Sequence, residues 1–319
     1  MKLSGEAAAL LTTLIWSIGV FPFTTAARRW GSHALNHYRL VLAVIILSCI
    51  LIFWNGLSFA QLFSLPNTSH WLWFGLSGII GLTIGDYFSF KSFEILGPRL
   101  STAFTTLSPV AAFLLAFFFI DETLNWIGLS GMLITIAGIL WLSTSKKDPA
   151  VVELDHKHRF LGLLFALLSP VCQGIGLVFS RKAFLSGGHD FELLAVHAAW
   201  LRMITATGSL YMFSLLNGSF TSVHRKIFSN ENNGILYAST GALFGPILGM
   251  ITSMYAVSIL DASVAQTIFG LVPVVVLLIS IIFFKERIRW FSVFATLLSI
   301  SGVVLLVWRD KIAELLKGM

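Results

Sequence analysis

Charged residues are scarce in this sequence. Only 11% of its 319 residues are Asp, Glu, Lys or Arg, whereas 56% are hydrophobic. One soluble core cannot bury that much apolar surface. The mean hydropathy of +0.86 therefore excludes an ordinary soluble domain and predicts an integral membrane protein.

Cysteine and the motifs of catalysis are also rare or missing. The two cysteines, Cys49 and Cys172, fall in apolar runs, where a small apolar filler is a commoner role than a disulfide. His37 and His197 have no carboxylate at a metal-ligand spacing, and the sequence contains neither HExxH nor the GxxxxGK[ST] loop that binds ATP. No Ser/His/Asp set is apparent either. We therefore expect no metal, no cofactor and no enzymatic activity.

Basic residues give the chain a formal net charge of +6 but form no basic domain. They are scattered over short loops, so no nucleic-acid site is expected. The face that carries both termini would hold six Lys and Arg residues and the opposite face twelve. Positive loops favour the cytoplasm, so this tally predicts that both termini lie outside, although one early loop such as 28–29 can dominate.

Long apolar runs are abundant. A spanning helix needs roughly 20 apolar residues, and the alternating pattern of a transmembrane barrel is absent. The sequence therefore predicts an all-α integral membrane protein with ten transmembrane helices, at about 4–26, 33–54, 71–93, 100–120, 124–144, 160–182, 192–216, 234–258, 263–284 and 289–308.

One half of the chain repeats the other. Residues 81–142 align without a gap on 245–306, an offset of 164 residues, and the matches include Gly81/Gly245, Gly85/Gly249, Ser89/Ser253, Pro109/Pro273, Glu122/Glu286, Trp126/Trp290 and Gly138/Gly302. Earlier spans align more loosely and pair Arg39 with Arg202. Since five spans is an odd number, the second half must enter the membrane in the opposite sense. We expect inverted repeats at 1–144 and 160–308, joined by the polar linker 145–159, and a charged tail at 309–319.

A family resemblance follows from these features. The segment GDYFSFKSFEILGPRLSTAFTTLSPV, its counterpart TSMYAVSILDASVAQTIFGLVPV, the arginine pair, and glutamates just after proline-containing spans resemble the EamA-like family of the drug/metabolite transporter superfamily, over essentially the whole chain. The resemblance implies a solute carrier with a central cavity between its halves, lined by spans one to four and six to nine. It also implies cytoplasmic termini, against the charge tally.

Matched proline breaks in two repeats indicate a binding site. Pro109 and Pro273 each remove a helix hydrogen bond and are expected to kink their spans. Thr102 and Thr106 share a helical face with Pro109, and Gln266 shares one with Pro273. Small residues at such places can equally serve close packing.

Asp86 is the carboxylate that lies well inside a predicted span. Such a group costs roughly 3 kcal/mol unless it faces a cavity or a partner, so it is a candidate proton carrier and solute ligand. The alternative is an ion pair that holds spans together. Its neighbour Tyr87 and Lys91, four residues further on, share one helical face, and Lys91 aligns with Tyr255; these positions are further solute-binding candidates.

The remaining candidates are charged or aromatic. Arg39 and Arg202 could bind a carboxylate or phosphate in forked geometry, or brace helix ends. Glu122 is expected to cap the N-terminus of the next helix. Trp16 aligns with Gln173, so one repeat is aromatic and the other polar there, which suits a part-apolar solute; packing is the alternative for Trp16.

The sequence therefore favours a secondary transporter that exports small polar metabolites such as amino acids. An exchanger of nucleotide sugars or sugar phosphates is the alternative, and a membrane enzyme or partner subunit is a remote one. The expected partners are a small-molecule solute, the lipid bilayer and, as an open alternative, further copies in a homo-oligomer. The expected location is a bacterial inner membrane.

Overall fold

The computed structural model describes residues 3–105, 107–144, 156–186, 194–229, 233–284 and 290–317. Within these ranges the chain forms helices and no strand, which confirms the predicted all-α class. Five of the described helices are individually long and apolar enough to cross a bilayer, and they include Ser32–Trp54 and Gly234–Ile259. Two shorter apolar helices, Ser108–Ile120 and Trp126–Trp141, occupy the predicted spans 100–120 and 124–144.

The chain divides into two compact units. Unit 1 comprises Met1–Ile84 and Phe179–Ile259, and unit 2 comprises Gly85–Val178 and Leu260–Met319. Each unit therefore takes helices from both sequence repeats, so the repeats are not the compact units. The repeat boundaries at 144 and 160 stay a prediction about the sequence.

Unit 1 is built from helices of its two segments of the chain. Its elements are α1 (Gly5–Trp30), α2 (Ser32–Cys49), the π-helix η1 (Ile50–Trp54), α3 (Phe59–Ser64), α4 (Thr68–Ser77), most of the π-helix η2 (Gly78–Gly85), the end of α8 (His156–Ser186), α9 (Ala195–Leu216), α10 (Phe220–Ser229), α11 (Gly234–Ala242), the π-helix η5 (Leu243–Gly249) and α12 (Met250–Ile259).

Unit 2 contains the remaining helices. They are α5 (Asp86–Thr105), α6 (Ser108–Ile120), α7 (Trp126–Thr144), the larger part of α8, α13 (Ala262–Phe269), α14 (Val272–Phe284), α15 (Trp290–Val307) and α16 (Arg309–Lys317). The predicted charged tail thus forms a helix, α16, which bends by 68° from the end of α15.

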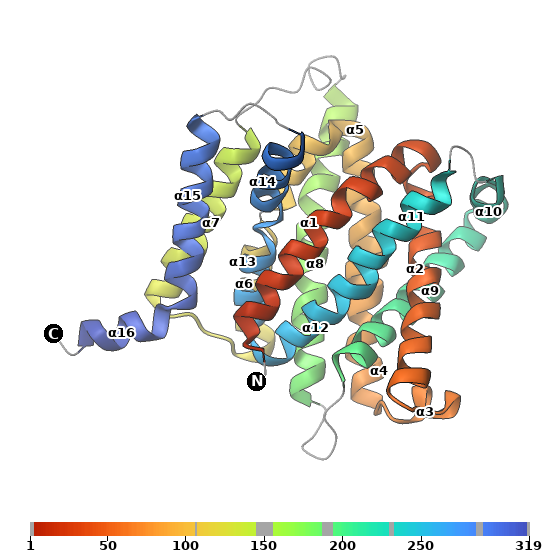
Figure 1. Ribbon diagram of the computed structural model, residues 1–319, viewed down its shortest axis with the longest axis horizontal. Coiled ribbons are helices and arrows are strands. Elements are labelled where there is room, and N and C mark those ends of the chain that lie inside the picture. Colours follow the sequence, from red (N-terminus) through yellow and green to blue (C-terminus); the bar gives the residue numbers. More distant parts are fainter. Residues whose placement is uncertain are drawn as a thin grey trace. The chain divides into compact units, whose positions relative to one another are not determined.

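Two repeat-equivalent helices of unit 2, α7 and α15, lie side by side (Figure 1). A Cβ atom on Gly131 would lie 2.7 Å from the carbonyl oxygen of Gly302, and one on Gly138 would lie 2.8 Å from that of Ala295. At the repeat offset, Ala295 is the counterpart of Gly131 and Gly302 is the counterpart of Gly138. The two contacts are therefore the same contact made twice, with the helices antiparallel, as an isologous two-fold arrangement requires.

The residue pair at the centre of this contact consists of a residue and its own counterpart. Thr135 Oγ1 donates to the carbonyl oxygen of Ser299 at 3.4 Å, and the two positions are 164 residues apart. A pseudo-two-fold axis across two antiparallel helices is the relation expected for inverted repeats. The predicted inversion of the halves is thus visible within unit 2.

Helices α2 and α9 of unit 1 are also repeat equivalents that pack against each other in a pseudo-two-fold arrangement. Trp200 Nε1 donates to Ser48 Oγ at 2.7 Å, and the rings of His37 and Tyr211 are 5.1 Å apart. At an offset of 163 residues, the one that aligns the two span arginines, Trp200 is the counterpart of His37 and Tyr211 is that of Ser48. This pair is also antiparallel and nearly symmetric, although its side chains have diverged.

Both predicted proline breaks are present in the structure. Pro109 and Pro273 each lie in the first turn of a new helix, α6 and α14, after the preceding helix has ended. The missing N–H of proline has no partner to lose in a first turn. The two spans are consequently divided into separate helices and are not bent within one helix.

Replacement of Gly302 by Ala should destabilise the α7–α15 contact. The new Cβ would lie 2.5 Å from Thr135 N and 2.6 Å from Gly131 O, both backbone atoms, so the helices must separate. We expect a loss of about 1–3 kcal/mol of unfolding free energy, typical of overpacking. Denaturant unfolding of the purified protein in detergent measures it.

Gly208 provides the matched control, because a Cβ there would meet no atom within 4 Å. Gly208→Ala should be neutral or stabilising by up to about 1 kcal/mol, since alanine favours helix. Equal destabilisation by both substitutions would contradict the close approach of α7 and α15.

Candidate functional site

A carboxylate and an amide from different repeats meet inside unit 2. Gln173 Nε2, on α8, donates to Asp86 Oδ1, at the start of α5, at 2.9 Å. Both side chains are partly buried. Helix α8 is held close to α6 next to this pair, because a Cβ on Gly174 would lie 2.8 Å from Ala112 N. Predicted candidates from both halves are thus brought together here.

Asp86 directly follows a π-helix. The π-helix η2 ends at Gly85, and in the other repeat η5 ends at the matching Gly249. π-Helical turns are rare and occur mostly at functional sites, because the widened turn costs hydrogen-bond geometry. The matched pair places Asp86 and its counterpart Met250 at the first position beyond equivalent distortions.

The equivalent junction in unit 1 is apolar. Trp16, which aligns with Gln173, donates its indole N–H to Gly245 O at 3.3 Å. A Cβ on Gly249 would lie 2.2 Å from Trp16 Nε1, so the ring lies directly against this glycine. Helix α1 and η5 therefore pack through an aromatic side chain where unit 2 has the Asp86–Gln173 hydrogen bond. A solute contact for Trp16 stays a prediction.

Arg202 is buried in unit 1, with 4% of its surface exposed. One terminal nitrogen of its guanidinium lies 3.4 Å from Met250 Sδ and 3.6 Å from Met254 Sδ, both on α12. Thioether sulfur is a weak acceptor. The Arg202 backbone also abuts η2, since a Cβ on Gly78 would lie 2.3 Å from its carbonyl oxygen. Arg202 therefore joins three elements of unit 1.

Arg39 makes local contacts on α2 and α1. Its Nε donates to Asn36 Oδ1 at 2.8 Å, and its guanidinium carbon lies 5.7 Å from the centre of the Phe23 ring. Both predicted roles of Arg39, anion binding and bracing of a helix end, stay predictions.

The other predicted residues are distributed over both units. The Tyr87 ring lies 6.4 Å from that of Phe165 in unit 2, and Tyr255 donates to the Leu3 carbonyl oxygen at 3.1 Å in unit 1. Lys91 on α5 and Gln266 on α13 are partly buried. Thr106 and the side chain of Thr102 lie outside the described residues, so their predicted roles stay predictions.

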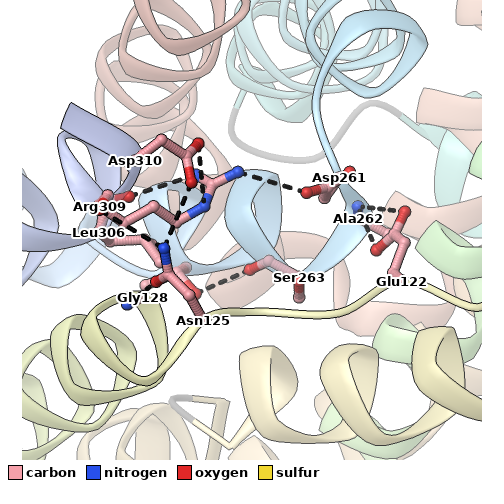
Figure 2. Close-up of polar contacts among 10 residues, drawn as sticks. Glu122, Asn125, Gly128, Asp261, Ala262, Ser263, Leu306, Arg309 and Asp310 are labelled. Carbon is pink, nitrogen blue, oxygen red and sulfur yellow. Dashed lines mark hydrogen bonds and ion pairs between the residues drawn. The ribbon is translucent and has the colours of Figure 1, made fainter. Parts of the chain in front are cut away.

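Glu122 is a helix cap, but not of the helix that the sequence suggested. Its Oε1 and Oε2 accept from the backbone N–H of Ala262 at 3.0 and 2.9 Å, so the buried carboxylate covers the N-terminus of α13 in the other repeat (Figure 2). The next helix, α7, is capped by Asn125, whose Oδ1 accepts from Gly128 N at 2.8 Å. The prediction that Glu122 caps a helix is confirmed, but the helix is α13 and not the next one in the sequence. Proximity in sequence does not identify spatial neighbours. Glu286 lies outside the described residues.

A polar cluster beside this cap was not predicted. Arg309, at the start of α16, lies 3.4 Å from Asp261, which directly precedes α13, and 3.8 Å from Asp310 (Figure 2). Asn125 Nδ2 donates to Arg309 O at 3.4 Å. The cluster therefore joins the ends of α7, α13 and α15. In the sequence, Arg309 counts only among the basic residues that predict membrane orientation. Because it is 48 residues from Asp261, no local pattern predicts their contact.

Among the described residues, no group of three or more His, Cys, Asp or Glu side chains is arranged to hold a metal ion. The chemistry available at the Asp86–Gln173 pair is hydrogen bonding, ion pairing and proton binding by the carboxylate.

Two comparisons with known proteins point to a transporter, and a third shows the fold. A family model for the EamA-like transporter family matches residues 3–144 and 160–308. A protein of Clostridium kluyveri (strain ATCC 8527 / DSM 555 / NBRC 12016 / NCIMB 10680 / K1), named "Uncharacterized transporter", is 22% identical over 293 residues, which cover 89% of this chain and 88% of the relative. A solved structure described as "Crystal structure of protein" has a TM-score of 0.69 at 16% identity and covers 96% of this chain and 98% of its own. At that identity the structural likeness shows the fold alone.

Removal of the Glu122 carboxylate should fray the first turn of α13. We expect Glu122→Ala to cost about 0.5–2 kcal/mol, typical for loss of a helix cap, and Glu122→Gln to cost less because one acceptor oxygen remains. Hydrogen exchange of the Ala262 amide, followed by mass spectrometry, should accelerate in the alanine variant.

The neighbouring Asp121 serves as control. It is exposed and has a left-handed backbone with φ of 54°, a conformation that asparagine tolerates. Asp121→Asn should leave exchange in α13 unchanged. Unchanged exchange in Glu122→Ala would refute the cap.

Proposed function

Because the chain belongs to the EamA-like transporter family, we propose that it is a secondary transporter that exports small polar metabolites, with amino acids as the leading class. The observation that supports this proposal is the Asp86–Gln173 hydrogen bond of 2.9 Å, which links α5 of the first repeat to α8 of the second. A family transporter needs a polar recognition group within its spans, and this pair supplies one.

The carboxylate suits a cationic part of a solute. Within lipid-embedded helices, a carboxylate is retained where it serves a pathway or a proton relay. An ammonium group presents several N–H donors, and Asp86 and the Gln173 carbonyl provide acceptors of the complementary kind. Amino acids and related amines carry such a group.

The same carboxylate can couple export to protons. A proton and a solute ammonium compete for Asp86, because each neutralises its charge. A proton that binds from one side displaces the solute toward the other, and the reverse step reloads the carrier. Exchange of this kind needs no ATP, in agreement with the missing nucleotide-binding loop.

An exchanger for phosphorylated solutes fits the geometry less well. Phosphate recognition uses convergent cations. Arg202 contacts thioether sulfurs on α12, whereas Arg39 contacts Asn36 and Phe23, so these contacts do not place the two guanidinium groups around one anion. We therefore favour the amine-bearing metabolite.

Asp86→Asn should abolish proton-driven transport. Proteoliposomes that contain the wild-type protein and a labelled amino-acid mixture should show faster movement of label across the membrane when a pH gradient is imposed than without it. The variant has a permanently neutral amide, so its flux should not respond to the gradient. Its flux should also be at least about tenfold lower than that of the wild type. Asp121→Asn, outside the spans, should transport like wild type.

Gln173→Leu tests the pair independently. A hydrogen bond from the solute ammonium to the Gln173 side-chain carbonyl would contribute about 1.5–3 kcal/mol, so its loss should weaken solute affinity by about 10- to 100-fold. A wild-type protein that moves no labelled metabolite under any gradient would refute the export function. Full pH-dependent flux in Asp86→Asn would refute proton coupling through Asp86 but not the export function.

A further inference from the structure

Helix α10 is a short helix between two spans of unit 1. Three residues separate it from the end of α9 at Leu216, and it is followed by the span that starts with α11. A helix in that position lies at the membrane surface, at the level of the lipid headgroups. Its sequence, FTSVHRKIFS, carries basic and apolar residues on different faces.

One face of α10 is fixed to the protein. Val223 is 4% exposed and belongs to an apolar cluster with Trp30 and Leu35, against which Ile227 also packs. His224 Nε2 lies within hydrogen-bond distance, 3.2 Å, of the Tyr211 hydroxyl on α9. The orientation of α10 on α2 and α9 is therefore fixed.

The opposite side of α10 is basic, and an exposed aromatic ring lies at its border with the fixed face, where the Phe228 ring is 6.4 Å from that of His224. Arg225 and Lys226 are exposed, and the Phe228 side chain is 82% exposed. Exposure of an aromatic ring to water is unfavourable. At the headgroup boundary of a bilayer, the ring can enter the acyl region while nearby cations reach the phosphates.

The neighbouring α1–α2 turn extends this basic surface. Lys226 Nζ lies 3.9 Å from the position that a Cβ of Gly31 would take, so its ammonium is next to the turn. Arg29 is exposed and its guanidinium carbon lies 4.4 Å from the centre of the Tyr237 ring. Residues 27–39, 217–229 and 233–241 contain no Asp or Glu. The described residues of this surface therefore carry no acidic side chain, and the sequence places one, Glu231, in the loop that follows α10.

We propose that α10 and the α1–α2 turn form a docking surface for the phosphate headgroups of anionic phospholipid. Arg225, Lys226 and Arg29 attract the negative headgroups, and Phe228 inserts beside them. A free inorganic phosphate would satisfy the cations but gives no reason for the exposed ring. The surface also holds this end of unit 1 at the leaflet richer in anionic lipid.

Helix α16 serves as an internal contrast. It is of similar length and also lies at a span end, but its exposed charges alternate in sign as Asp310, Lys311 and Glu314. Cationic residues near an anionic surface each contribute about 1 kcal/mol, and mixed charges cancel. Anionic lipid should therefore prefer α10.

The test is native mass spectrometry of the full-length protein, released from detergent that contains equal amounts of phosphatidylglycerol and phosphatidylcholine. Wild type should retain phosphatidylglycerol preferentially. Lys226→Gln should lower that retention about fivefold and the double variant Arg225→Gln/Lys226→Gln about 30-fold. Phe228→Ser should lower it several-fold. Lys311→Gln, which removes one cation from α16, should have no effect.

Thermal unfolding of each variant separates lipid binding from folding, because the substituted side chains are exposed and should leave the midpoint unchanged. Equal retention of both lipids by wild type, or equal losses in Lys226→Gln and Lys311→Gln, would overturn the proposal. Displacement of lipid by excess inorganic phosphate, with no effect of Phe228→Ser, would identify a free-phosphate site and also overturn it.

Discussion

The close approach of helix backbones at small residues is the constraint on which the structure depends. Lipid gives no hydrophobic drive for one helix to bind another, so association requires van der Waals contact and hydrogen bonds between helices that fit closely. Gly131, Gly138 and Gly302 allow this between α7 and α15. Because each contact has a repeat-equivalent copy, the same packing also fixes the antiparallel relation of the two helices.

The two repeats share one backbone arrangement but differ in the side chains that it carries. Equivalent π-helices end at Gly85 and Gly249, and the next residue is a carboxylate in one repeat and a thioether in the other. The polar junction, Asp86 with Gln173, carries the proposed recognition and coupling. The apolar junction, with Trp16 against Gly249, holds α1 to η5. One ancestral packing arrangement thus serves two purposes.

The sequence predicted those features that depend on local composition or on the repeat. Apolar runs predicted the helical spans, and the odd number of spans predicted inversion. It did not predict which residues meet across long separations. Glu122 was expected to cap the next helix but covers Ala262, 140 residues away. The Arg309–Asp261 contact has no sequence pattern at all.

The inverted pairing of α7 and α15 can be tested by distances between spin labels in a variant whose two cysteines are replaced by serine. Trp126 and Trp290 are repeat equivalents at the starts of these helices, and both are exposed, as is Trp308 at the far end of α15. Antiparallel packing predicts about 27 Å or more between labels at Trp126 and Trp290, from the 19 residues of α7 at 1.5 Å each, and a much shorter distance between Trp126 and Trp308. The reverse order of distances would contradict inverted repeats.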